Sequence, residues 1–84
     1  MKYRLTDETM WPKSDITLYR IQAVKDFGDV KVGDLGGWVE SEDNLSQNDN
    51  CWIYGNARVW GDARVLDNAR VLGNARITGN AKIC

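Results

Sequence analysis

The sequence predicts an all-β protein in which an N-terminal β cap covers a short solenoid of stacked coils. Three observations lead to this prediction. In the C-terminal half, aliphatic residues recur at every sixth position, small residues recur two positions before them, and Gly, Asn or Asp lies between. A period of six matches neither the 3.6-residue period of an α-helix nor the alternation of a long strand. It is typical of repeats that stack on one another.

The six-residue repeat predicts which side chains fill the interior. If the aliphatic position is numbered 1, positions 1 and 5 are two residues apart in extended chain, so their side chains point the same way. Position 1 holds Ile53, Val59, Val65, Val71, Ile77 and Ile83. Position 5 holds Ala57, Ala63, Ala69, Ala75 and Ala81. We therefore expect both positions to face inward.

Positions 3 and 4 hold Gly, Asp or Asn, which tolerate the left-handed backbone that a tight corner needs. Three short sides joined by such corners close a coil of about eighteen residues, in which residues eighteen apart lie above one another. The register can be traced back to Leu35, with Gly37 at position 3 and Val39 at position 5. Residues 35–84 would then form eight hexads, or roughly 2.7 coils.

Residues 1–34 do not carry the repeat and are expected to form the cap. "ITLYRIQAV", from Ile16 to Val24, is typical of a strand, and Lys2 to Leu5 can pair with it. A solenoid needs such a cap over its first coil. The predicted division is a cap over 1–34 and a solenoid over 35–84 in one compact domain. Trp11 and Trp38 are expected to anchor the cap and the core.

The repeat resembles that of the hexapeptide proteins, which form left-handed, LpxA-like β-helices. The segments "KYRL", "VKDFGDVKVGDLGGWV" and "NLSQNDNCWIY" resemble the N-terminal region of the YdcK-like group of bacterial and phage hexapeptide proteins. The resemblance implies a left-handed coil and a parallel trimer. Because members of the group include phage proteins, it also suggests a phage accessory role.

Composition excludes several classes of protein. The net charge of −1 argues against a dedicated nucleic-acid or polybasic membrane binder. Residues 1–50 carry six basic and ten acidic residues, and residues 51–84 carry five and two, so the halves carry −4 and +3. No apolar run is long enough to span a membrane and no signal peptide follows Met1. A cytoplasmic protein with reduced cysteines is expected, within the bacterial host if a phage encodes it.

The residue types also predict a protein that is not an enzyme. Acyltransferases with hexapeptide repeats use a histidine as general base between subunits, and this sequence has no histidine. Cys51 and Cys84 alone make no metal site. No phosphate-binding glycine loop is present. We therefore expect no catalytic residue, no cofactor and no bound metal.

Two outward-facing columns are the candidate binding residues. Position 2 holds Tyr54, Trp60, Leu66, Leu72 and Thr78. Position 6 holds Arg58, Arg64, Arg70, Arg76 and Lys82. Exposed apolar groups that cluster usually mark an interface. Position 2 is therefore the candidate contact for self-association or for a different protein, and position 6 is a candidate contact for an acidic partner. On position 6, Arg70 is expected to stack on Trp52.

These observations favour a non-enzymatic, homotrimeric protein-binding module, with inhibition of a host defence complex as one such role. Two alternatives remain open. The first is a truncated or degenerate acyltransferase-like protein that keeps the N-terminal module. The second is a nucleic-acid binder or mimic, whose retention on DNA would weaken steeply with salt.

Overall fold

A computed structural model describes all 84 residues, Met1–Cys84. Its regular structure consists of strands and one short 3₁₀ helix, so the all-β prediction is confirmed. The N-terminal half contains β1 (Tyr3–Lys13), β2 (Ile16–Ala23), β3 (Leu35–Val39) and the 3₁₀ helix η1 (Glu42–Asn44). Six two-residue strands follow: β4 (Trp52–Ile53), β5 (Arg58–Val59), β6 (Arg64–Val65), β7 (Arg70–Val71), β8 (Arg76–Ile77) and β9 (Lys82–Ile83).

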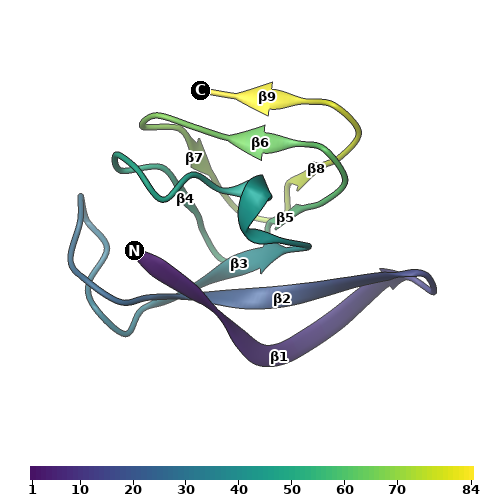
Figure 1. Ribbon diagram of the computed structural model, residues 1–84, viewed down its shortest axis with the longest axis horizontal. Helices are drawn as coiled ribbons and strands as arrows, with labels where there is room; N and C mark the ends of the chain where they lie inside the picture. Colours follow the sequence, from purple (N-terminus) through teal and green to yellow (C-terminus); the bar gives the residue numbers. More distant parts are fainter.

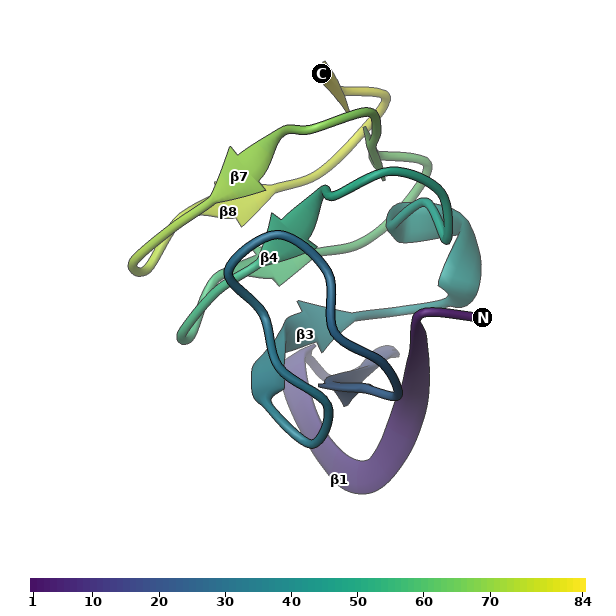
Figure 2. The same cartoon turned by 90° about the vertical axis from the view of Figure 1, so that its left-hand side faces the viewer.

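The short strands stack as the three sides of a β-helix-like coil (Figures 1 and 2). The β3 side contains β3, β5 and β8, the β6 side contains β6 and β9, and the β4 side contains β4 and β7. All pairs between coils are parallel. The predicted order of a hairpin followed by a short stack of coils is therefore confirmed. The left hand of the coil stays a prediction from the resemblance.

From Trp52 onward, the stacking repeats every eighteen residues. Trp52 pairs with Arg70, Arg58 with Arg76, and Arg64 with Lys82. The left-handed backbone of the corners falls at position 3, where Gly61 has φ 73° and the non-glycine residue Asp67 has φ 58°. Aspartate accepts this conformation more readily than most L-residues because its short polar side chain bonds locally.

Positions 1 and 5 face inward, as the repeat predicts. The side chains of Ala57, Val59, Ala63 and Val65 are fully buried in the second coil. In the third coil the corresponding side chains are only partly buried, because the described chain places no coil above them. These partly buried residues are Ala75, Ile77, Ala81 and Ile83.

The register traced back to Leu35 is wrong by two residues. Val39 pairs with Val59 and Leu45 bridges to Val65, each a separation of twenty and not eighteen. Two extra residues therefore lie between Leu45 and Cys51. As a result, Val39 occupies position 1 and the side chain of Leu35 is 52% exposed. Turn-compatible Asn and Asp residues fill this stretch, so the insertion leaves no break in the sequence pattern.

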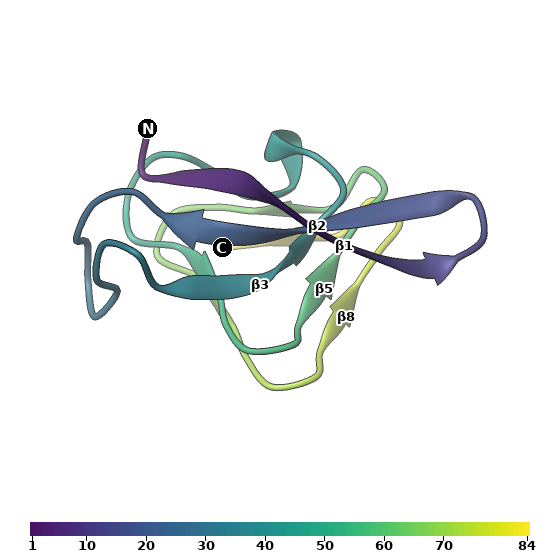
Figure 3. The same cartoon turned by 90° about the horizontal axis from the view of Figure 1, so that it is seen from below.

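The cap is an antiparallel hairpin that crosses beneath the first coil (Figure 3). Strand β2 also pairs with β3, which joins the hairpin to the solenoid in one five-stranded sheet. Tyr3, Leu18 and Ile21 are fully buried, so the predicted cap exists. Trp38 is 8% exposed, as expected of an anchor, but Trp11 is 62% exposed because it lies near the projecting end of the hairpin.

Lys2 ties the cap to the two-residue insertion. Its buried ammonium group donates to the carbonyl oxygens of Asn48 (3.1 Å), Asp49 (3.1 Å) and Cys51 (2.8 Å). Desolvation of the ammonium group lowers the pKa of Lys2, and the nearby Cys51 and Asp49 oppose that shift. Three carbonyl acceptors satisfy the donors of the ammonium group, which is the usual requirement for burying a lysine.

The loop over residues 24–34 covers the β4 side. Phe27 of this loop packs edge-on against Trp52 with ring centroids 5.2 Å apart, and Tyr3 contacts the same indole at 6.2 Å. Trp52 is therefore 2% exposed although it occupies an outward position. The expected stacking of Arg70 on Trp52 is wrong, because the loop covers the indole. The cation–π contact that involves an arginine joins Arg20 and Trp38, at 4.6 Å.

Candidate functional site

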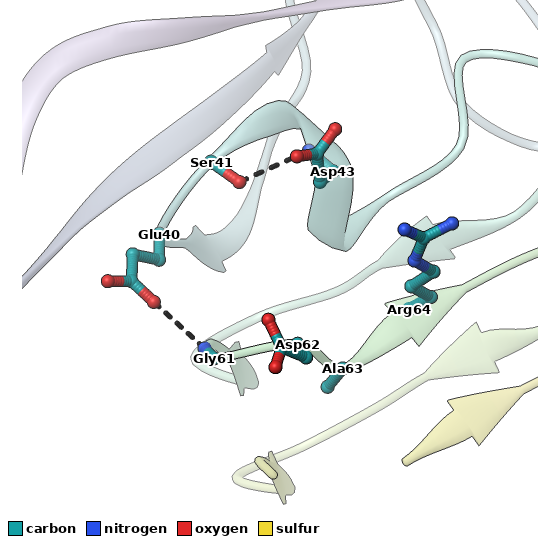
Figure 4. Close-up of a pocket in the computed structure, with 7 residues that line it drawn as sticks. All are labelled: Glu40, Ser41, Asp43, Gly61, Asp62, Ala63 and Arg64. Atoms are coloured by element: carbon teal, nitrogen blue, oxygen red, sulfur yellow. Dashed lines mark hydrogen bonds between the residues drawn. The ribbon is translucent and has the colours of Figure 1, made fainter. Parts of the chain in front are cut away.

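A polar pocket of about 620 Å³ lies at the corner between the β3 side and the β6 side (Figure 4). The segment after β3 forms one wall, and the turn between β5 and β6 forms the other. Its lining residues are Glu40, Ser41, Asp43, Gly61, Asp62, Ala63 and Arg64. The pocket thus brings together side chains from two successive coils.

Asn44 fixes the two walls relative to each other. Its side-chain oxygen accepts hydrogen bonds from the backbone N–H groups of Glu40 (3.0 Å) and Ser41 (2.9 Å). Its amide nitrogen donates to the carbonyl oxygens of Gly61 (3.1 Å) and Ala63 (2.9 Å) in the next coil. Asn44 is fully buried, and the bond to Ala63 is shielded from water, while the other three bonds are partly buried.

The acidic side chains are positioned by the local backbone. The carboxylate of Glu40 accepts a hydrogen bond of 2.8 Å from the N–H of Gly61, which spans the corner. The hydroxyl of Ser41 caps η1 by accepting from the N–H of Asp43 at 3.2 Å. Asp62 stands at position 4 on the opposite wall (Figure 4).

This arrangement offers three carboxylates, one hydroxyl and the guanidinium group of Arg64. Carboxylates can bind a cationic amine or accept its proton, and a guanidinium can bind an anionic group. No cluster of three or more His, Cys, Asp or Glu side chains has a geometry that would hold a metal ion. Both cysteines are free thiols: Cys51 is buried and Cys84 is exposed. The pocket is therefore suited to binding a molecule that carries an amine.

The structure distributes the position 2 residues over all three sides. Leu72 is 58% exposed and Thr78 is exposed, whereas Trp60 and Leu66 are partly buried. Tyr54 is already engaged, since its hydroxyl donates to the carboxylate of Asp29 at 2.7 Å. Burial raises the pKa of Tyr54, and the bond to Asp29 raises it further. The five residues therefore do not form one continuous patch within a single chain.

The position 6 residues are also distributed over the sides. Arg58 and Arg76 lie on the β3 side, and Arg64 and Lys82 lie on the β6 side. Arg70, on the β4 side, approaches the carboxylate of Asp29 to 4.0 Å. Arg58, Arg64, Arg76 and Lys82 form no ion pair within the chain.

Sequence reasoning missed the pocket. Asp62 occupies a corner position of the repeat, and nothing in the repeat indicates that it lines one pocket with Glu40 and Asp43 of the coil below. The available signal was the run of acidic residues from Glu40 to Asp43, directly before the clear repeat. Because two residues are inserted after Leu45, the eighteen-residue spacing alone places this acidic run two residues away from its true partners in the next coil.

No family model matches the chain. The chain is similar to a protein of Escherichia coli (strain K12) named uncharacterized acetyltransferase YdcK. The two are 42% identical over 60 residues, which cover 63% of this chain and 18% of the relative. The chain therefore spans less than a fifth of that relative's length. This similarity supports the predicted relationship to the YdcK-like group.

The comparison overturns the expectation that the protein is not an enzyme, because the similar protein is named an acetyltransferase. That expectation was based on the absence of histidine. The absence of histidine does not exclude catalysis, since carboxylates also act as general bases in enzymes. No helix of the structure is long and apolar enough to cross a membrane.

Proposed function

We propose that this chain forms the capped first coils of an acetyltransferase-like β-helix protein. The observation that carries the proposal is the 42% identity to YdcK over 60 residues. The fold agrees with it, because the cap closes one end of the coil and the parallel strands present an ordered face at each corner. This proposal follows the acyltransferase-like alternative, which the comparison favours over the non-enzymatic interpretation.

Within this proposal, the pocket between Glu40 and Asp62 binds the acetyl acceptor. Its carboxylates attract a protonated amine from water. Once bound, the ammonium group gives one proton to a carboxylate, and the neutral amine nitrogen then attacks the acetyl carbonyl carbon. The C–N bond forms, the C–S bond to a thioester donor breaks, and the released thiolate takes up the second proton that the nitrogen loses. Glu40 is the favoured base because the N–H of Gly61 holds its position.

The proposal is tested by the release of free thiol from acetyl-coenzyme A in the presence of small primary amines. The variants are Glu40→Gln and Asp62→Asn, with Asp67→Asn as the matched control at a different corner. Asparagine tolerates the positive φ of Asp67. We expect amine-dependent release by the unmodified protein, a loss of about 100-fold or more in the pocket variants, and little change in the control. No amine-dependent release, or equal release by all variants, would contradict the proposal.

A second candidate function is homo-oligomeric protein binding through position 2. The exposed Leu72, at 58%, favours it, because an exposed large aliphatic group on a regular face is suited to an interface. Light scattering on the purified protein and on the Trp60→Asp/Leu72→Asp variant tests it. We expect a trimer that dissociates in the variant. A monomer in both samples would rule out self-association through this column.

A further inference from the structure

The outer face of the β3 side carries a ladder of arginine and tryptophan side chains. Arg20 pairs with Trp38, Trp38 with Arg58, and Arg58 with Arg76, so the four residues follow one another across adjacent strands. Strands β5 and β8 lie next to each other in Figure 3. Neighbouring strands are about 4.8 Å apart, so the side chains of Arg58 and Arg76 leave the backbone at adjacent points.

The three sides differ in how their cationic groups are balanced. On the β4 side, Arg70 approaches the carboxylate of Asp29. On the β6 side, Arg64 and Lys82 also pair in register without an ion pair, but Arg64 lines the pocket that contains Glu40, Asp43 and Asp62. On the β3 side, Arg58 and Arg76 pair with each other in register and neither forms an ion pair. The β3 side therefore carries two adjacent positive charges that the chain does not neutralise.

The lower end of the ladder is already occupied by contacts within the chain. Arg20 stacks on Trp38, its guanidinium donates to the side chain of Asn56 at 3.3 Å, and it lies 3.9 Å from Glu8. Its side chain is 19% exposed. The arginines that remain available to a ligand are therefore Arg58, which is partly buried, and Arg76, which is exposed.

Trp60 adds an aromatic group to the same face. Val59 between Arg58 and Trp60 is fully buried, so the two flanking side chains both point outward. Trp60 is partly exposed, and its backbone N–H donates to Ile77 at 3.0 Å, which fixes it beside β8. Arginine and tryptophan are enriched at the centres of protein interfaces.

We propose that the face formed by Arg58, Trp60 and Arg76 docks a short acidic segment of a partner protein. Carboxylates of the segment bind the two guanidinium groups in bidentate pairs, and an apolar side chain beside them packs on the indole. This inference goes beyond the proposed acetyl transfer, and it does not depend on the pocket. Mutation of one surface leaves the residues of the other unchanged.

Charge around the face favours an acidic peptide segment over a nucleic acid. Glu40 lies one coil below Trp60, with its backbone N–H donating to Val59, and the carboxylate pocket begins at the adjacent corner. A continuous phosphate backbone would have to run past these carboxylates. The net charge of −1 also provides no broad positive field. A short peptide segment carries carboxylates at only a few positions, so it can keep them away from Glu40 and from the carboxylates of the pocket.

The test measures the binding of a synthetic peptide of about ten residues, which contains two Leu among Glu residues. Binding is followed by calorimetry. A peptide with Gln in place of Glu, and a thymidine oligonucleotide of similar length, serve as competing probes. The variants are Arg58→Glu/Arg76→Glu and the milder Arg58→Gln/Arg76→Gln. The matched control is Arg64→Glu/Lys82→Glu on the β6 side, and circular dichroism verifies that each variant folds.

We expect the acidic peptide to bind the unmodified protein. Its affinity for each of the two β3-side variants should be about tenfold or more lower. The control variant should change affinity by less than about threefold, and the Gln peptide should not bind. An equal loss of peptide affinity in the β3-side variants and the β6-side control would overturn the proposal, because it would indicate unspecific charge attraction. Tighter binding of the oligonucleotide, or no peptide binding, would also overturn it. Thiol release should stay unchanged in the β3-side variants, which separates this result from a failure of the proposed acetyl transfer.

Discussion

Asn44 shows how a single residue connects two coils of this small protein. A fully buried asparagine has four hydrogen-bonding sites, and here it bonds to four backbone groups on two coils. An apolar replacement would leave buried N–H and C=O groups without partners. The same contacts hold the two walls of the pocket together. Asn44 therefore contributes to both stability and the geometry of the candidate site.

We predict that Asn44→Ala lowers the free energy of unfolding by about 2–4 kcal/mol, because it removes the four hydrogen bonds of a fully buried side chain. Urea unfolding followed by tryptophan fluorescence measures this change. Asn48→Ala is the control, since Asn48 is exposed, and it should change stability by less than about 0.5 kcal/mol. Equal effects of the two substitutions would show that Asn44 does not link the coils.

The ionisation of Tyr3 should make the stability of the protein depend on pH in the alkaline range. Burial raises the pKa of its hydroxyl, and the nearby Glu42 raises it further. Since the folded pKa lies above the unfolded value of about 10, the contribution of Tyr3 is complete below pH 10 and is lost as pH rises beyond it. Unfolding measured between about pH 8 and pH 11 should therefore depend less on pH in Tyr3→Phe than in the unmodified protein. An identical pH dependence would contradict this account.

At the scale of the element, a side of the coil consists of only two hydrogen-bonded residues, and its stability depends on packing within the coil. A strand this short has little intrinsic stability in water. The inward alanines set the width of each coil. Ala63 is fully buried with coils on both faces, whereas Ala81 is partly buried in the last described coil.

Ala63→Leu should destabilise the protein by about 1–3 kcal/mol, because the additional methyl groups overfill a packed interior. Ala81→Leu should cost clearly less, since the last coil is open on one side. Thermal unfolding of both variants measures the difference. If Ala63→Leu is as stable as the unmodified protein, position 5 does not face the interior.

At the scale of the whole molecule, a hairpin cap closes one end and a partly exposed coil lies at the other. Strand β1 has two register irregularities in its pairing with β2, which make it a poor template for another strand. Strands β7, β8 and β9 lie at the opposite end, where Val71 of β7 is buried but Ile77 of β8 and Ile83 of β9 are only partly buried. The molecule is therefore asymmetric, and its open end favours the addition of a further coil.

A variant in which residues 67–84 are repeated after Cys84 should be more stable by roughly 2 kcal/mol. The added coil would complete the burial of Ile77 and Ile83, and burial of such a side chain stabilises by about 1.5–3 kcal/mol. Denaturant unfolding measures the gain. A Gly/Ser tail of equal length is the control, and an equal gain from that tail would contradict the stacking model.

The sequence by itself determined the class of fold and the inward positions. A strict period of six, with alanine and aliphatic residues two apart, is compatible only with short sides that share one interior, so positions 1 and 5 were predicted without coordinates. The cap was also predictable, because residues 1–34 lack the repeat and alternate as strands do. These features follow from the size and polarity of neighbouring residues in the chain, so a short stretch of sequence is enough to predict them.

Only the tertiary structure decided the register of the first coil and the location of the candidate site. The two-residue insertion before Cys51 is hidden among turn-compatible residues, and its position depends on the pairing of Val39 with Val59. The pocket depends on that register, because it joins Glu40 to Asp62 across successive coils. The covering of Trp52 by Phe27 likewise depends on how a loop folds over a distant strand. Contacts between residues far apart in the chain follow from packing in three dimensions, which no single repeat encodes.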